Sequence, residues 1–406
     1  MDVVMLINNS ANSNARYVTW AYSPCSVRLT NTTGATAPVQ VTLRNKPPAS
    51  GGRVVFQATG ASARASSLAL TLPLNGGSIP FFISGDFGHP STADGDCVIQ
   101  VLRGTQVLLE VPIMVRIRKN ANTLSVPERD RFIAAFAALN NRGTGRFTDF
   151  RDMHTEVSKG QAHGAPGFLP WHRSYLLDLE RELQAIDPSV ALPYWRFDQP
   201  GPNVFTPDFM GTGGPNNEVQ FSAANPFQFW VTDGVPGIER GPLFNPVSGK
   251  ANVLSEAQTL GISTTFPLFA SRMEGDPHGN AHTSFTGAIM SIGTAARDPL
   301  FFLLHSNVDR LWAKWQRQFI RFVATQPDSF DNSSSLVGHR LADTMWPWNG
   351  ITGGTRPPNA PGGTLAPSTT VTAPGPQPFV RDMFDFQGGF VLAEQLGFDY
   401  DDVRFA

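Results

Sequence analysis

Six of the eight histidines in this 406-residue chain fall into two groups of three, and this grouping constrains the fold more than any other feature. The groups are His154, His163 and His172, then His278, His282 and His305. A single buried histidine is usually a structural residue with satisfied hydrogen bonds. Six histidines grouped in this way instead indicate two adjacent metal sites, each with an open position for a small molecule.

Helical periodicity predicts that histidines of both groups are buried. In "GFLPWHRSYLLDLERELQ" the stripe that contains His172 also holds Leu176, Leu179 and Leu183. In "DPLFFLLHSNVDRLWAKWQ" the stripe that contains His305 holds Phe301, Val308, Trp312 and Trp315. His278 and His282 are four residues apart on a predicted helix, so they share one face and can chelate one ion.

The chain changes character near residue 120, which predicts two domains. Residues 1–119 contain short pieces rich in Val, Thr, Leu and Phe, such as "SVRLT", "VQVTLR", "VVFQA", "LALTL" and "QVLLEVPIMVRIR". This pattern predicts an all-β sandwich. An immunoglobulin-like sandwich stays open, although the buried Trp expected between Cys25 and Cys97 is missing. Residues 120–406 are predicted to form a mainly helical domain.

Three helix starts are marked in the second domain. Ser125 and Glu128 stand at capping-box spacing around Pro127, and Asp–Pro pairs at 276–277 and 298–299 precede two histidine-bearing segments. Residues 350–379 are rich in Pro, Gly and Thr and predict either a linker or a long covering loop.

Composition narrows the classes of partner that the chain is expected to bind. Charged residues make up 16% of the chain, the formal net charge is -2, and no run of Lys or Arg stands out. These values predict no nucleic-acid partner and favour a small neutral molecule. No apolar stretch reaches the length of a membrane span, and the N-terminal sequence lacks the pattern of a secretory signal, which favours the cytoplasm. Whether Cys25 and Cys97 form a bridge is left open.

The types of ligand favour copper. Imidazole suits copper, zinc, iron and nickel, whereas calcium and magnesium prefer oxygen ligands. Zinc hydrolysis is the main alternative, but "HGNAH" lacks the glutamate of the zinc-protease pattern. Neither group contains the Glu-x-x-His pair of di-iron bundles. Six neutral ligands without a bridging carboxylate fit copper best.

Long motifs around these histidines resemble the type 3 copper family of tyrosinases, catechol oxidases and haemocyanins. "FLPWHRSYLLDLE" resembles the motif of the first copper, and "DPLFFLLHSNVDRLW" resembles that of the second. "LPYWRFD", "RMEGDPHGNAH", "MWPWNGITGGT" and "LGFDYDD" support the likeness, which covers roughly residues 122–406. It implies a dicopper domain built on a four-helix bundle, with one copper on each group of three histidines.

The resemblance implies an oxidase that uses O2 to convert o-diphenols to o-quinones. Hydroxylation of monophenols is left open as a second activity of this polyphenol oxidase. Two alternatives remain, an oxygen carrier of the haemocyanin kind and an enzyme that oxidises an aminophenol or phenol in secondary metabolism. The expected partner is a small phenolic substrate, and the oligomeric state is undetermined.

The resemblance also implies roles for residues around the ligands. Glu274 resembles the family glutamate that holds a water able to accept the proton of a phenol. Gly279 stands where strongly hydroxylating members often carry an Asn that helps to orient this water. Phe301 is expected to pack beneath the site. Arg173, Asn307 and Asp309 flank the ligand helices and are expected to fix the orientation of ligand rings. For the charged Arg173 and Asp309, an ion pair on the helix surface is the alternative.

Two departures from the family pattern stand out. Many members bond a Cys to the second histidine ring of the first copper, but this position is Gln161 here, so no thioether can form. Arg196 stands where an acidic residue is usual, and the sequence suggests no reason for the exchange.

Overall fold

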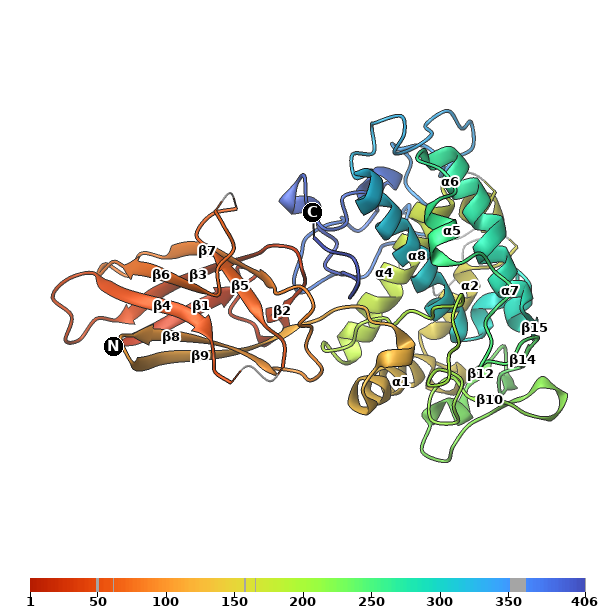
Figure 1. The fold of residues 1–406 in the computed structure, drawn as a ribbon, viewed down its shortest axis with the longest axis horizontal. Coiled ribbons are helices and arrows are strands. Elements are labelled where there is room, and N and C mark those ends of the chain that lie inside the picture. Colours follow the sequence, from red (N-terminus) through yellow and green to blue (C-terminus); the bar gives the residue numbers. More distant parts are fainter. Residues whose placement is uncertain (49–50, 61, 157, 165, 351–362, 406) are drawn as a thin grey trace. The chain divides into compact units, whose positions relative to one another are not determined.

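The computed structural model describes residues 1–406 apart from 49–50, 61, 157, 165, 351–362 and 406. It divides into two compact units (Figure 1). The first unit comprises Met1–Ile117, Ser368–Thr372 and Gln387–Ala406, and the second comprises Arg118–Pro367 and Ala373–Phe386. The sequence predicted a division after residue 119, with the whole remainder in one domain. The structure instead divides the chain after Ile117 and returns part of the C-terminal chain to the first unit.

The first unit is built from two β-sheets. One sheet has the strand order β1-β3-β7-β5 and the other the order β2-β9-β8-β4-β6. The strands are β1 (Asp2–Ile7), β2 (Tyr17–Val18), β3 (Ser23–Asn31), β4 (Val39–Asn45), β5 (Val54–Gln57), β6 (Ser67–Leu72), β7 (Ile79–Gly85), β8 (Cys97–Arg103) and β9 (Gln106–Val115). All pairings are antiparallel except β2 with β9. The β-rich character that the sequence predicts for this region is confirmed.

One hydrophobic cluster draws side chains from both sheets. Along β3 buried and more exposed residues alternate, so Cys25, Val27 and Leu29 face the cluster. Cys97 of β8 belongs to the same cluster, and both cysteines are free thiols. Burial raises the pKa of each thiol to about 12, so both stay protonated at neutral pH.

The C-terminal segment is part of the first unit because a buried carboxylate ties it to the N-terminal chain. Asp399 accepts hydrogen bonds from the backbone N of Trp20 at 2.9 Å and from Nε2 of Gln387 at 2.6 Å. Nε1 of Trp20 donates to the carbonyl of Tyr400 at 2.9 Å. Residues that are distant in sequence therefore complete one core.

The second unit is mainly helical. Its α-helices are α1 (Val126–Asn140), α2 (Phe147–Met153), α3 (Lys159–Ala162), α4 (Phe168–Ile186), α5 (Glu256–Leu260), α6 (Phe266–Met273), α7 (Asn280–Thr283) and α8 (Leu300–Phe319). Three short pairs of strands accompany them, namely β10 (Thr212–Gly213) with β11 (Val219–Gln220), β12 (Val231–Thr232) with β13 (Val235–Pro236), and β14 (Arg240–Pro242) with β15 (Phe285–Gly287). No helix among the described residues is long and apolar enough to cross a membrane.

Two of the three predicted helix starts are confirmed. The capping box of Ser125 and Glu128 opens α1, and Oδ1 of Asp298 accepts from the backbone N of Leu300 at the first turn of α8. The third prediction is wrong in detail. A π-helical segment, Glu274–Gly279, carries His278 and is interrupted at Asp276, so a regular helix begins only with α7. Of the stretch 350–379, residues 351–362 lie outside the described residues.

Replacing Asp399 by Asn is expected to change how stability depends on pH. Burial raises the pKa of this carboxyl to about 6, although its hydrogen bonds act in the opposite direction. A raised pKa in the folded state means that the contribution of Asp399 to stability is complete at low pH and is lost as pH rises through about 6. The Tm of the wild type should therefore fall relative to that of Asp399→Asn between about pH 4 and 7.

Thermal unfolding of both proteins across this range measures the difference. Asp94→Asn, which removes an exposed carboxylate of the same unit, controls for the change in net charge. Parallel profiles for the wild type and Asp399→Asn would contradict the expectation.

Candidate metal centre

The first three histidines converge from the ends of two short helices and the start of a long one. His154 is the C-cap of α2, His163 is the C-cap of α3, and His172 lies in the second turn of α4. One ring nitrogen of each lies within 4.8 Å of the others. This first triad is the group that the sequence predicted.

The second triad likewise brings together histidines from three separate elements. His278 comes from the π-helical segment, His282 from α7 and His305 from α8. Their ligand atoms also lie within 4.8 Å of one another. His278 and His282 come together, with ring centroids 4.8 Å apart, although they do not share one regular helix. The backbone irregularity therefore preserves the pairing that helical spacing suggested.

The two triads face each other. The rings of His172 and His305 are stacked, with centroids 4.3 Å apart and planes inclined by 9°. His163 and His278 are likewise stacked, at 5.8 Å. The two triads therefore border one shared site.

Hydrogen bonds fix the orientation of five of the six rings through Nδ1. The acceptors are the carbonyl of Ile292 for His154 at 3.0 Å, Oε1 of Glu274 for His163 at 3.1 Å, and the carbonyls of Phe168 for His172 at 2.9 Å, Glu274 for His278 at 2.8 Å and Ile289 for His282 at 2.7 Å. Because carbonyl and carboxylate oxygens only accept, these Nδ1 atoms carry the proton. The lone pair of each neutral ring is then on Nε2.

In the first triad, two Nε2 lone pairs point at each other with no proton between them. Nε2 of His154 lies 3.0 Å from Nε2 of His163, although both rings carry their proton on Nδ1. Nε2 of His172 and Nε2 of His278 are buried and have no hydrogen-bond partner among the described residues. Lone pairs that are buried and unpartnered, or opposed at hydrogen-bond distance, are costly unless a cation binds them. The donor set fits a metal ion in each triad.

Protonation does not satisfy these nitrogens at neutral pH. Burial lowers the pKa of His154, His172, His278 and His305 well below the ordinary value, and repulsion from neighbouring histidines lowers it further. The pKa of His282 falls to about 4, mainly through burial. These rings are therefore neutral ligands, as copper, zinc and iron require.

Aromatic side chains enclose the centre. Phe301 packs against His305 and His154, with ring centroids 4.2 and 4.7 Å apart, and it is fully buried. Phe168, which the sequence did not single out, packs against His172 at 4.8 Å and His278 at 4.9 Å. Water is excluded from these faces, so the apolar wall preserves the low dielectric of the site.

Arg173 and Asp309 form a buried ion pair between the two long ligand helices. Nε of Arg173 lies 2.6 Å from Oδ1 of Asp309, and both side chains are at most 2% exposed. Arg118 approaches the other oxygen of Asp309 at 3.3 Å. Because both side chains are buried, the alternative of a helix-surface contact is wrong. The pair instead joins α4 to α8.

Asn307 also contacts a neighbour on its own helix. Its Oδ1 accepts from Nη1 of Arg310 at 3.1 Å, while its Nδ2 is buried without a partner among the described residues. Gly279 has ordinary helical backbone angles, but a Cβ there would lie 3.3 Å from the carbonyl of Glu274. A side chain at 279 would thus press on the carbonyl that holds His278.

Glu274 contacts both triads through different atoms. Its Oε1 accepts from Nδ1 of His163 and, at 2.8 Å, from the backbone N of Gly164, whereas its carbonyl accepts from His278. The side chain is 19% exposed, so it stands at the edge of the centre. The structure thereby gives Glu274 an orienting role that the sequence did not suggest.

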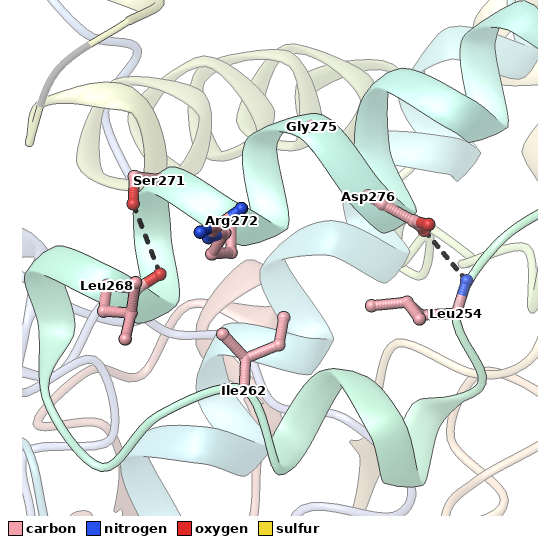
Figure 2. A pocket seen from close by; sticks show the side chains of 7 residues that line it. All are labelled: Leu254, Ile262, Leu268, Ser271, Arg272, Gly275 and Asp276. Atoms are coloured by element: carbon pink, nitrogen blue, oxygen red, sulfur yellow. Dashed lines mark hydrogen bonds between the residues drawn. The ribbon is translucent and has the colours of Figure 1, made fainter.

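A hydrogen bond on the outer side anchors the segment that carries Glu274. Oδ1 of Asp276 accepts from the backbone N of Leu254 at 2.8 Å, and both residues line a surface cleft together with Ile262, Leu268, Ser271, Arg272 and Gly275 (Figure 2). No ligand histidine lines this cleft. This cleft is therefore not the place of the metal chemistry.

Arg196 now has a structural explanation. Its guanidinium forms two hydrogen bonds with Asp198, at 2.7 and 2.9 Å, and lies 3.1 Å from Oε2 of Glu256. Glu256 also pairs with Arg310 and Lys314. Burial opposes ionisation of Asp198 and Glu256, but these cations keep the pKa of both carboxyls below the ordinary value. The arginine thus belongs to a charge network that ties α5 to α8.

Comparisons with known proteins agree with this geometry. Residues 144–318 match the family model described as the common central domain of tyrosinase. The chain is 34% identical to a tyrosinase of Streptomyces glaucescens over 270 residues, which cover 57% of this chain and 92% of that protein. The chain belongs to the tyrosinase family. It is also 30% identical to grixazone synthase of Streptomyces griseus over 262 residues, 50% of this chain and 85% of that one.

Solved structures with similarity to the chain include a functional unit of octopus haemocyanin and a tyrosinase from Burkholderia thailandensis at high pH. The first has a TM-score of 0.45 at 20% identity, covering 71% of this chain and 69% of that one. The second has a TM-score of 0.44 at 16% identity, covering 71% and 75%.

Membership of the tyrosinase family together with two all-imidazole triads settles the cofactor. The centre takes two copper ions, and O2 is the co-substrate. The two triads fit this pair because they offer six imidazole nitrogens and no carboxylate ligand.

Charge removal at Asp309 is expected to destabilise the second unit. Asp309→Asn keeps the shape of the side chain but leaves Arg173 and Arg118 without their shared carboxylate. Breaking a buried pair in this way costs about 3 to 5 kcal/mol. Urea unfolding followed by Trp fluorescence measures the loss.

Asp328→Asn is the matched control for this prediction. Asp328 pairs with Arg321 at 3.1 Å, but its side chain is 55% exposed, so its loss should cost less than about 1 kcal/mol. Equal effects of the two substitutions would contradict the role given to Asp309.

Proposed function

We propose that this chain oxidises small phenols with O2, and that oxidation of o-diphenols to o-quinones is its main reaction. The observation that carries the proposal is the pair of facing triads, in which five of the six rings carry their proton on Nδ1 and keep the lone pair on Nε2. Two o-diphenols and one O2 give two o-quinones and two waters, so each diphenol loses two electrons and two protons. A copper pair, when bound, supplies the electron transfer between phenol and O2.

The residues of the chain hold this centre rigid and dry. The Nδ1 hydrogen bonds fix the ring planes, so little reorganisation accompanies a change in the charge of the centre. The walls formed by Phe168 and Phe301 exclude water from two sides. A flat phenol suits such an aromatic surrounding, because aromatic rings favour stacked and edge-to-face contacts with one another.

Glu274 is the group proposed to move the phenolic proton. Its carboxylate borders the first triad and is partly exposed, so a water beside it can bridge to an incoming hydroxyl. One of its oxygens already accepts two hydrogen bonds. Because residue 279 is a glycine, no amide side chain at this position forms a second hydrogen bond to this water. Monophenols, which must lose a proton on binding, should therefore react more slowly than diphenols.

We also propose a finer description of the fold. The long helices α4 and α8, joined by Arg173 and Asp309, would form the centre of a four-helix bundle together with α2 and α7. The hydrophobic cluster shared by the two sheets supports a β-sandwich in the first unit.

Gly279→Asn is expected to raise the ratio of monophenol to diphenol turnover. The Asn side chain gives the water a second hydrogen-bond partner. Glu274→Gln should lower the ratio, because the Gln amide is a poorer proton acceptor than the carboxylate. Initial rates on tyramine and dopamine, compared at equal copper content, measure the ratio.

Gly279→Ala is the matched control, because it brings the same Cβ to 3.3 Å from the carbonyl of Glu274 without the amide. A rise in Gly279→Ala as large as that in Gly279→Asn would assign the effect to packing. A wild type that already prefers tyramine would refute the proposed order of activities.

A screen of O2 uptake separates the proposed oxidase from its alternatives. Steady uptake with catechols supports the proposal. Reversible O2 binding without turnover of any phenol would favour a carrier, and turnover confined to o-aminophenols would favour a specialised synthetic enzyme. The 30% identity with grixazone synthase gives the last alternative its support.

A further inference from the structure

His339 is a buried histidine outside both triads, and both of its ring nitrogens are engaged. The backbone N of Gly167 donates to Nδ1 at 3.0 Å, and Nε2 donates to the carbonyl of Gly160 at 2.8 Å. Nδ1 must be unprotonated to accept, so the ring is a neutral imidazole with its proton on Nε2. Its side chain is completely buried.

The two glycines flank the ligand His163. Gly160 lies in α3, which ends just before His163, and Gly167 is the N-cap of α4. A Cβ at Gly167 would lie 2.7 Å from Nδ1 of His339, so the close approach requires a glycine at this position. One imidazole ring therefore connects both ends of the segment that presents His163.

Gln161 adds a second connection between the same segments. Its Oε1 accepts from the backbone N of Trp346 at 2.9 Å. Gln161 stands two residues before His163. Three hydrogen bonds thus hold Gly160, Gln161 and Gly167 to His339 and Trp346.

We propose that His339 and Gln161 form a non-covalent clamp that positions His163. The inference rests on the proposed function, because His163 matters as a ligand of the first copper. The clamp fixes the backbone on both sides of His163, and Glu274 fixes the ring itself. Both members are positioning residues, since neither reaches a metal or substrate.

The clamp predicts an uneven effect on the two copper sites. Without it, the backbone around His163 gains freedom that copper binding has to remove, whereas the second triad keeps all its contacts. Loss of the clamp should weaken copper binding at the first triad by about tenfold or more, as is typical for residues that orient ligands. Binding at the second triad should stay within about twofold of the wild type, because its orienting contacts are unchanged.

His339→Phe and His339→Gln test the clamp. Phe retains an aromatic ring but removes both hydrogen bonds, whereas Gln can accept from Gly167 and donate to Gly160, so it should restore the wild-type behaviour. His89→Phe is the matched control, because His89 lies in the first unit with its side chain 44% exposed. Copper titration against a competing chelator counts tightly and weakly held ions in each protein.

A second readout uses the copper-free protein. The amide proton of Gly167 precedes the first turn of α4 and is bonded to His339, so its exchange with solvent should be at least about tenfold faster in His339→Phe. It should be unchanged in His339→Gln and His89→Phe. This exchange does not depend on copper, and a merely destabilised protein would show faster exchange throughout the core.

The outcomes distinguish the clamp from the proposed function. A wild type that binds no copper would refute the proposed function, while selective exchange at Gly167 would still support the contact. Two tightly held coppers in His339→Phe, with Gly167 protected, would overturn the clamp. If His339→Phe does not fold, Gln161→Leu takes its place, and two tightly held coppers in that variant would overturn the clamp equally.

Discussion

Two triads of closely packed imidazoles, with ring nitrogens directed at one another, form the interaction on which the rest of this structure depends. Nε2 of His154 and Nε2 of His163 lie 3.0 Å apart, and burial keeps the surrounding rings unprotonated. Such an arrangement is unfavourable by itself, because each nitrogen has lost water without gaining a partner. Copper binding removes this unfavourable interaction, which contributes to the affinity for the metal. The surrounding protein therefore has to keep the rings in place before the metal binds.

The second unit provides that resistance with charges and hydrogen bonds placed around the rings. The ion pair of Arg173 and Asp309 joins α4 to α8, and the network around Glu256 joins α5 to α8. Buried pairs of this kind contribute little net stability, but separating them is costly. They therefore favour one arrangement of the ligand helices over nearby alternatives, which is what a site with opposed lone pairs requires.

Much of the centre could be predicted from the sequence because helical periodicity is a local signal. The apolar stripes around His172 and His305 predicted their burial, and Ser125 with Glu128 marked the start of α1 correctly. The pairing of His278 with His282 was also predicted, but the irregular backbone that carries His278 was not. Spacing of four residues indicates a shared face only when the helix is regular.

The remaining features depend on contacts between distant residues, which leave no local signal. The carbonyls of Ile289 and Ile292 orient two ligand rings, and any residue supplies a carbonyl. Asp399 completes the first unit from the far end of the chain, whereas the sequence placed residues 120–406 in one domain. His339 had no motif around it, although its place between Gly160 and Gly167 explains its burial.

The most direct test of this account is the metal content and anomalous X-ray scattering of the purified protein, recorded above and below the copper edge. The account predicts two copper ions per chain, one bounded by His154, His163 and His172 and the other by His278, His282 and His305. Zinc at these positions, a single ion, or a metal held through Nδ1 in place of Nε2 would contradict it.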